Sequence, residues 1–306
     1  MQPTKPYNDL PDFLAKKFPY KVQKTTIHAG FTCPNRDGSK AYGGCTYCNN
    51  QSFSPRYQTS PKTISEQLAD GIKFYSDKYP DVKYLAYFQS YTNTYADLQS
   101  LIDMYEEALA YPNVVGLIIG TRPDCISDEL LDYLEELNKK TFVLVEYGVE
   151  STRNETLEKI NRQHTYEESV DAILRTAKRN IPVGVHLILG LPGETNEIIL
   201  HHANELSKLP LTTVKLHQLQ IIKGTQMEKE FRQSPESFRL FQLEEYIDLC
   251  VAFVERLHPD FYIERFSSHS PPEWRIAPEW GIKNVEIAHK VAKKLRERGS
   301  WQGRLV

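Results

Sequence analysis

The chain has 306 residues, of which 40% are hydrophobic and 25% charged, and its net charge is −3. This composition excludes a disordered, collagen-like or disulfide-dense protein, and the length suffices for a full hydrophobic core. No apolar run reaches the length of a transmembrane span, and the first residues lack the apolar core of a secretory signal. We therefore expect a cytoplasmic protein with reduced thiols and no membrane partner.

Short runs rich in Val, Ile, Leu, Tyr or Phe alternate with amphipathic runs along most of the chain. The first kind predicts strands at 24–28, 84–89, 114–120, 142–148, 183–189 and 213–219. The second kind predicts helices at 63–78, 96–110, 128–138, 166–179 and 195–208. Ser127 and Thr165 are suited to cap two of these helices.

Six βα units in series predict an α/β fold with a parallel sheet and right-handed crossovers. A partial (β/α)6 TIM-like barrel fits better than an open doubly wound sheet, because no strand is followed by a glycine-rich dinucleotide fingerprint. We expect residues 1–225 to form this barrel. Residues 226–306 then form a C-terminal α/β extension packed on it, with a helix at 241–257, a strand at 262–265 and a basic helix at 284–298.

Three of the five cysteines, Cys33, Cys45 and Cys48, lie in the loop 30–50 after the first predicted strand, where a barrel gathers its functional residues. Three thiolates leave one iron of a [4Fe–4S] cube without a protein ligand, which is the open position that a reactive centre needs. The residues alone leave two alternatives to this cluster: a zinc site with His28 or another histidine as the fourth ligand, and unligated thiols. We expect Cys250 to be a core residue, and Cys125 to be a structural or a substrate-handling thiol.

Charge is distributed unevenly. Residues 1–62 contain nine basic and three acidic residues, and residues 283–306 contain seven basic and two acidic ones, so the middle of the chain is acidic. If the two ends meet in space they form one basic patch; the plainer interpretation is a solvated helix face.

The cysteine loop and further motifs resemble the radical S-adenosylmethionine (radical SAM) superfamily, and within it the YhcC/YtqA-like branch related to the catalytic subunit of the elongator complex. The first two cysteines have eleven residues between them, whereas the commonest form of the superfamily has three. The motifs run in order through nearly the whole chain. They are AGFTCPNRDG at 29–38, GGC at 43–45, YFQSYTNTY at 87–95, TRPD at 121–124, GVES at 148–151, INRQHT at 160–165, GLPGE at 190–194, KLH at 215–217 and KGT at 223–225.

The resemblance implies a [4Fe–4S] cluster ligated by Cys33, Cys45 and Cys48, with SAM chelated to the open iron. An electron donor of the flavodoxin or ferredoxin type would reduce the cluster, and the radical formed from SAM would abstract hydrogen from a substrate. The cofactor-binding residues implied are Tyr47, Gln89, Ser90, Glu150, Ser151, Arg162 and Gly190. For Glu150, Arg162 and Gly190 the plainer interpretations are a helix cap, a surface ion pair and a βα turn.

Arg122, His186 and His217 are the candidate catalytic residues, because they lie in or just after predicted strands and can face the substrate space. A histidine within a strand can equally be an ordinary core residue whose ring nitrogens are hydrogen-bonded. The elongator kinship implies the wobble uridine of tRNA as substrate. Relatives on the YtqA side imply that the reaction tailors its 5-position side chain by removing the carboxymethyl part of a carboxymethylaminomethyl group. A protein or a small metabolite is the alternative substrate, and a zinc-stabilised binding module is the alternative class. Trp274, Trp280 and Trp301 are suited to stack on bases or to pack the extension. The oligomeric state is left open.

Overall fold

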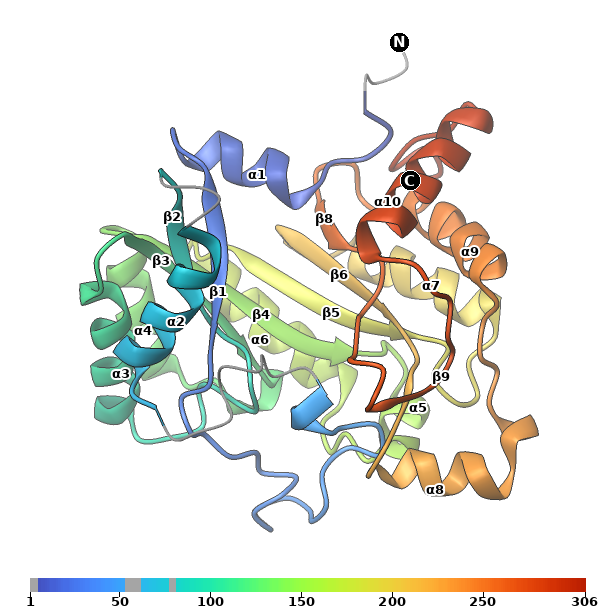
Figure 1. Ribbon diagram of the computed structural model, residues 1–306, viewed down its shortest axis with the longest axis horizontal. Coiled ribbons are helices and arrows are strands. Elements are labelled where there is room, and N and C mark those ends of the chain that lie inside the picture. Colours follow the sequence, from blue (N-terminus) through green and yellow to red (C-terminus); the bar gives the residue numbers. More distant parts are fainter. Residues whose placement is uncertain (1–4, 53–61, 77–80) are drawn as a thin grey trace.

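The computed structural model describes residues 5–52, 62–76 and 81–306, and its centre is a curled parallel sheet that forms a half-barrel (Figure 1). Seven strands lie in the order β1-β2-β3-β4-β5-β6-β8, and each pairs in parallel with the next. The strands are β1 (Val22–Ile27), β2 (Lys83–Phe88), β3 (Val114–Thr121), β4 (Phe142–Glu150), β5 (Val183–Leu189), β6 (Thr213–Gln218) and β8 (Tyr262–Arg265). The expected α/β half-barrel is confirmed, with one strand more than the six predicted for the barrel.

Helices cover the convex face of this sheet, as Figure 1 shows. Helices α2 (Ile64–Ser76), α3 (Leu98–Ala110), α4 (Asp128–Asn138), α6 (Tyr166–Lys178) and α7 (Asn196–Leu206) follow β1 to β5 in the chain. Their positions agree with the predicted helices; the last residues of the predicted helix 63–78 lie outside the described part of the chain. Short helices α1 (Leu10–Lys17), α5 (Asn154–Lys159) and α8 (Gln226–Gln233) were not predicted.

The predicted helix caps have the expected geometry. The Ser127 side chain accepts a hydrogen bond from the backbone N–H of Leu130 and so begins α4. Thr165 and Glu168 form a reciprocal capping box that begins α6. Such caps satisfy backbone donors that the helix itself leaves free. The capping box therefore fixes where α6 begins and where the loop before it ends.

Side chains alternate between the two faces of the strands, and this places polar groups inside the half-barrel. On β4, Val143, Val145 and Tyr147 belong to the main hydrophobic core under the helices. Glu146 and Gly148, at the alternate positions, line a cavity on the concave side. Period-two alternation thus divides one apolar-looking strand into a packing face and a polar inner face.

Helix α1 closes the amino end of the half-barrel. Phe13 is buried against Leu85, Ile118 and Leu144 on the inner faces of three strands, and its ring also packs on Tyr262 at 5.1 Å. The opposite end, at the carboxyl ends of the strands, is where the cavity opens.

The C-terminal region completes the sheet and covers it. Strand β8 pairs with β6, and α9 (Leu243–Glu255) packs beside α7 and α10 (Asn284–Glu297). A small antiparallel ribbon of β7 (Ile221–Ile222) and β9 (Arg275–Ala277) stands at the carboxyl end of the barrel. Because residues 226–306 supply one strand of the central sheet, the division at residue 225 stays a prediction.

The two chain ends meet, but their basic side chains are largely paired within the protein. The Gln302 backbone N–H donates to Pro6 at 2.8 Å. On α10, Lys294 and Arg298 both form ion pairs with Asp248 of α9. Figure 1 places α10 and the loop after β1 at opposite ends of the molecule. The basic tail therefore stabilises the packing of α9 on α10 and lies away from the cysteines.

Two further predictions concern burial. Cys250 is fully buried in the core, as predicted. Trp280 packs its ring on Tyr246 at 5.0 Å and donates its indole N–H to the Phe241 carbonyl, so it packs the extension. None of the helices in the described ranges combines the length and apolar character that crossing a bilayer requires.

Candidate active site

A cavity of about 360 Å³ opens at the carboxyl ends of the strands. The loop after β1 supplies one side of it, and strands β2 to β6 and the segment after β8 supply the rest. Most of the predicted site residues line this one cavity. They are Cys33, Cys45, Tyr47, Cys48, Gln89, Arg122, Glu150, Arg162, His186 and His217.

The cysteine loop is attached to the barrel by hydrogen bonds to the turn that precedes α6. The Asn35 amide donates to the backbone carbonyls of Asn161 and Arg162, at 2.7 and 3.1 Å. In return, the Asn161 amide donates to the Gly44 carbonyl at 2.9 Å. The Thr46 N–H donates to the Ile160 carbonyl. These contacts place Cys45 and Cys48 against the end of the barrel without any bond between thiols.

Two arginines lie beside the thiols. The Arg162 guanidinium donates to Cys45 Sγ at 3.6 Å, and Arg36 donates to the Cys48 carbonyl at 2.7 Å. Burial raises the pKa of the Cys48 thiol to about 11, while the Arg36 charge acts in the opposite direction. A thiolate at this position therefore needs more positive charge than Arg36 alone provides.

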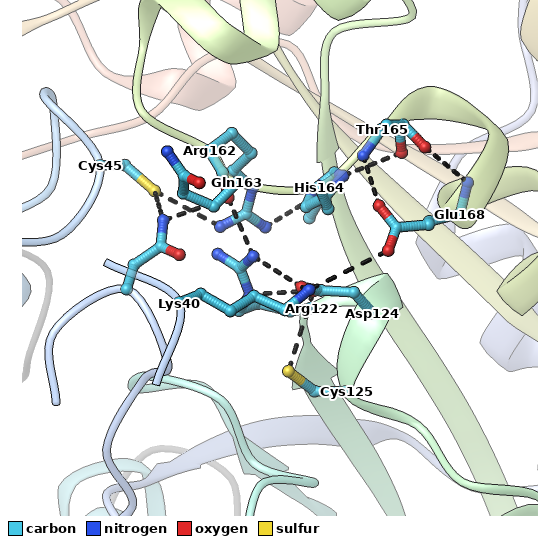
Figure 2. A network of polar contacts seen from close by, with 12 residues as sticks. Lys40, Cys45, Arg122, Asp124, Cys125, Arg162, Gln163, His164, Thr165 and Glu168 are labelled. Carbon is cyan, nitrogen blue, oxygen red and sulfur yellow. Dashed lines mark hydrogen bonds and ion pairs between the residues drawn. The ribbon is translucent and has the colours of Figure 1, made fainter. Parts of the chain in front are cut away.

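Arg122 is the centre of a buried polar network (Figure 2). Its Nε and Nη2 donate to the two oxygens of Asp124, both at 2.9 Å, and Nη2 also donates to the Arg162 carbonyl. Lys40 of the cysteine loop joins the same carboxylate at 2.6 Å. Burial alone would raise the pKa of Asp124, but the hydrogen bonds from Arg122 and Lys40 hold it well below its ordinary value. The network thus ties the cysteine loop to the end of β3.

Arg162 is a buried residue rather than the surface ion pair that was the plainer interpretation. Its Nη2 donates to the Gly148 carbonyl at 2.6 Å and lies 3.7 Å from a carboxylate oxygen of Glu150. Glu150 itself has a left-handed backbone, with φ of 67°. Such strain in a residue other than glycine is maintained only when its surroundings hold it, and it occurs often at functional sites.

Two buried donor atoms beside the cysteines have no hydrogen-bond partner within the described ranges. They are Nη1 of Arg122 and Nε of Arg162. Both residues line the cavity. A buried donor without a partner is costly, so the remaining hydrogen bonds of these two guanidinium groups must hold them in place.

Three of the predicted cofactor residues do not line the cavity in the part of the chain that the structure describes. Ser90 is buried. Ser151 donates to Glu194 at 2.6 Å, and Glu194 also meets His202 at 3.1 Å, inside a fully buried network. Gly190 faces Phe241: a Cβ built on it would lie 2.8 Å from the ring. Glycine is therefore required at position 190 for packing, and any role of Gly190 at the cofactor stays a prediction.

A group of charged side chains closes the bottom of the cavity, and it was not predicted. We call Lys24, Glu146, Lys215 and Glu264 the floor cluster. Each lysine contacts both glutamates, at N–O distances between 2.5 and 3.2 Å. Burial lowers the pKa of Lys215, whereas the two carboxylates outweigh burial at Lys24 and raise its pKa.

The two predicted strand histidines stand between the floor cluster and the cavity. His186 Nε2 lies 3.0 Å from Glu146, and His217 Nε2 accepts from Arg265 at 2.7 Å. Burial and neighbouring cations lower the pKa of both rings, with Lys215 acting on His186 and Arg265 on His217. Both histidines are therefore neutral at physiological pH.

The arrangement of the thiols fits a multi-iron cluster better than a single metal ion. In the described part of the chain, no three His, Cys, Asp or Glu side chains converge closely enough to hold one ion. Zinc would need four ligands about 2.0–2.3 Å from a single point. A [4Fe–4S] cube instead binds each cysteine at a separate iron. Of the histidines that the zinc alternative allows, His28 packs on Tyr91 and does not line the described cavity, whereas His186, His217 and His269 do line it.

Two known family patterns match this chain. The sequence pattern of the radical SAM superfamily matches residues 32–206, and that of the radical SAM C-terminal domain matches residues 211–297. The chain is 35% identical to YtqA of Bacillus subtilis over 98% of its own length and 92% of that protein. It is 25% identical to a tRNA uridine(34) acetyltransferase of Methanocaldococcus infernus over 60% of its length, but it spans only 34% of that protein.

A solved structure shows the same fold. The Elp3 protein of Methanocaldococcus infernus superposes with a TM-score of 0.69, at 18% identity. The likeness covers 92% of this chain and 64% of the Elp3 chain. The curled sheet and the helices that cover it thus have a known architecture.

Proposed function

The chain belongs to the radical SAM superfamily and is a radical SAM enzyme, and we propose that it uses a [4Fe–4S] cluster and SAM to modify the wobble uridine of tRNA. When bound, a cluster held by Cys33, Cys45 and Cys48 would supply the electron for reductive cleavage of SAM and so allow hydrogen abstraction from the substrate, and an electron donor of the flavodoxin or ferredoxin type would reduce it.

One observation carries the proposal. Three thiols from a single loop, Cys33, Cys45 and Cys48, line the same cavity as the polar ends of six barrel strands. Only three protein thiols are available there, since Cys125 does not line the described cavity and Cys250 is in the core. A four-iron cluster held by these three keeps one iron open for SAM.

The chain's own residues would bind the cluster and SAM, orient them and screen them from solvent. Arg162 and Arg36 place positive charge next to Cys45 and Cys48, where the cluster would bind. Arg122 and Arg162, which line the cavity, would place positive charge beside anionic groups of the occupant. Glu150, held in place by Arg162, offers a carboxylate to an ammonium or to ribose hydroxyls.

The choice of tRNA is supported by kinship alone. A relative that matches over 60% of this chain has the name tRNA uridine(34) acetyltransferase. This chain spans about a third of that protein, so its acetyl transfer is not proposed here. What we carry over is the uridine as the target of the radical.

The test compares tRNA nucleosides from cells that contain or lack the gene, by liquid chromatography and mass spectrometry. We expect one wobble-uridine derivative to change in the deletion strain, and the wild-type gene to restore it. The Cys45→Ala gene should not restore it. Unchanged uridine derivatives would refute the tRNA assignment and turn the search to proteins and small metabolites as substrates.

A further inference from the structure

Two neighbouring histidines lie on the inner face of the half-barrel. His186 is on β5 and His217 on β6, and both rings line the cavity, with their centroids 5.7 Å apart. The strand alternation explains this placement, because Val185, Leu187 and Leu216 belong to the core under the helices. The two rings therefore stand side by side on the polar face of the sheet.

The Nε2 atom of His186 carries a proton, because its partner is a carboxylate. It lies 3.0 Å from Oε2 of Glu146, whose side chain is 1% exposed. Burial alone would raise the pKa of Glu146, but the charges of Lys215 and Lys24 hold it well below its ordinary value. An ionised carboxylate only accepts hydrogen bonds, so His186 Nε2 is the donor. In a neutral ring the other nitrogen, Nδ1, then has the lone pair.

The Nε2 atom of His217 has the opposite role. Nε and Nη2 of Arg265 both donate to it, at 3.1 and 2.7 Å. A guanidinium has donors only, so His217 Nε2 must accept with its lone pair. The proton of this neutral ring is therefore on Nδ1. Glu146 and Arg265 thus fix two adjacent rings in opposite tautomers.

We propose that His217 and His186 together bind a neutral amide-type group of the substrate, in which an N–H stands beside a carbonyl. With Nε2 of both rings held by the protein, Nδ1 is the nitrogen of each ring that a molecule in the cavity can meet. His217 donates to the carbonyl, and His186 accepts from the N–H. A carboxylate has acceptors only and an ammonium has donors only, so either ion would satisfy one ring and face a like group on the other.

The inference rests on the proposed function for taking this cavity as the reaction site. In the uracil ring of the proposed substrate an N–H stands beside a carbonyl, so the histidine pair is suited to read that edge of the base. What the structure adds is the pair of residues that reads the substrate, and the requirement that the group they read is neutral.

The first measurement is nitrogen-15 NMR of the full chain labelled at histidine and purified anaerobically with its cluster oxidised. The shifts of the ring nitrogens distinguish the tautomers, and His186→Phe and His217→Phe assign the signals. We expect the proton on Nε2 in His186 and on Nδ1 in His217. Arg265→Met should return His217 to a mixture of tautomers, whereas Arg232→Met, at an exposed arginine on α8, should leave it unchanged. The same tautomer in both rings of the wild-type protein would overturn the proposal.

The second measurement uses two matched pairs of probes that differ by one methyl group on nitrogen. They are 2-pyrrolidinone and N-methyl-2-pyrrolidinone, and uridine and 3-methyluridine. Methylation removes the N–H that His186 accepts. In titrations followed by the ring nitrogen shifts, we expect the unmethylated member of at least one pair to bind on the order of tenfold more tightly. His186→Phe keeps a ring without nitrogens and should abolish this difference, followed through the His217 signal.

The outcomes separate the histidine pair from the proposed function. If the pyrrolidinones differ and the uridines bind equally, the amide site stands and the uridine assignment fails. A chain that holds no cluster would refute the proposed chemistry, and its tautomers and pyrrolidinone binding would still decide the amide site. Three results would overturn that site: equal binding within both pairs, no binding of any probe at millimolar concentration, or a difference that persists in His186→Phe. The comparisons on the wild-type protein do not depend on whether a variant folds.

Discussion

The cavity has two ends whose polar groups are satisfied in different ways. At the floor cluster, two lysines and two glutamates satisfy each other inside the protein. At the cysteine end, Arg122 Nη1 and Arg162 Nε are buried without a partner in the described chain. Paired charges of this kind indicate a part of the fold. At the other end three thiols line the cavity beside Arg122 and Arg162, and this is the end where we propose that the cofactor binds.

The largest effect is expected at the cysteine end. Cys45→Ala removes a cluster ligand, so iron content and 5′-deoxyadenosine formation should both fall to background. Cys125→Ala is the matched control: burial raises the pKa of that thiol to about 12, and it does not line the described cavity. Iron analysis and chromatography of the SAM products provide the measurements. A Cys45→Ala protein that still cleaves SAM would contradict the assignment of the ligands.

Substitution of a residue in the floor cluster should lower the free energy of unfolding. Lys215→Met leaves two buried carboxylates with fewer partners and should lower the free energy of unfolding by about 3–5 kcal/mol. Lys139→Met removes an exposed lysine–glutamate pair on the surface and should leave the free energy of unfolding nearly unchanged. Anaerobic urea unfolding distinguishes the two. Equal losses would mean that the floor cluster does not behave as a buried network.

The pH dependence of stability tests the cysteine end without any cofactor. Burial and the charge of Arg162 lower the pKa of His164 to about 3 in the folded protein. The neutral ring is favoured in the fold, so this contribution is complete above the unfolded pKa of about 6.5 and decreases as the pH falls toward 3. Because of this ring, the free energy of unfolding should be about 2 kcal/mol lower at pH 5 than at pH 7. Between pH 7 and pH 5 the His164→Gln protein should therefore lose less stability than the wild type, by this same amount, as measured by urea unfolding. Equal losses in the variant and the wild type would contradict the burial of a neutral ring.

The smallest effect concerns the contact between Arg162 and the Cys45 sulfur. Hydrogen bonds and charge near the sulfurs help to set the potential of an iron–sulfur cluster. Arg162→Gln should therefore make the cluster harder to reduce and lower its potential by about 50 mV, close to a tenfold change in equilibrium constant. A redox titration followed by electron paramagnetic resonance measures it. Arg153→Gln, at a partly exposed arginine nearby, should change nothing; an equal shift in both variants would remove the contact as the cause.

Much of this molecule could be predicted from the sequence, because its strands are short β-branched runs and its helices begin at good caps. The strand 183–189 and the helix 128–138 have the predicted bounds. The cysteine loop was also placed correctly after the first strand. Helix α5, by contrast, has only six residues, too few for a helical period to stand out.

The floor cluster and Arg265 were missed for a different reason. A single charged residue within a strand gives no sign of which face it occupies. The signal that could have found Glu146 and Lys215 was the strand alternation: His217 was predicted to face the cavity, and Lys215 lies two residues before it. Partners such as Lys24 and Glu264 lie 240 residues apart and meet only because the sheet curls. Motif order likewise could not show that Gly190 faces Phe241.

The central claim is that the cysteine end holds a SAM-cleaving cluster. The most direct measurement is anaerobic purification of the full chain, followed by iron and sulfide analysis and reduction with dithionite in the presence of SAM. We predict about four iron and four sulfide per chain, and methionine and 5′-deoxyadenosine in equal amounts. A colourless, zinc-loaded protein without iron that leaves SAM intact would contradict it.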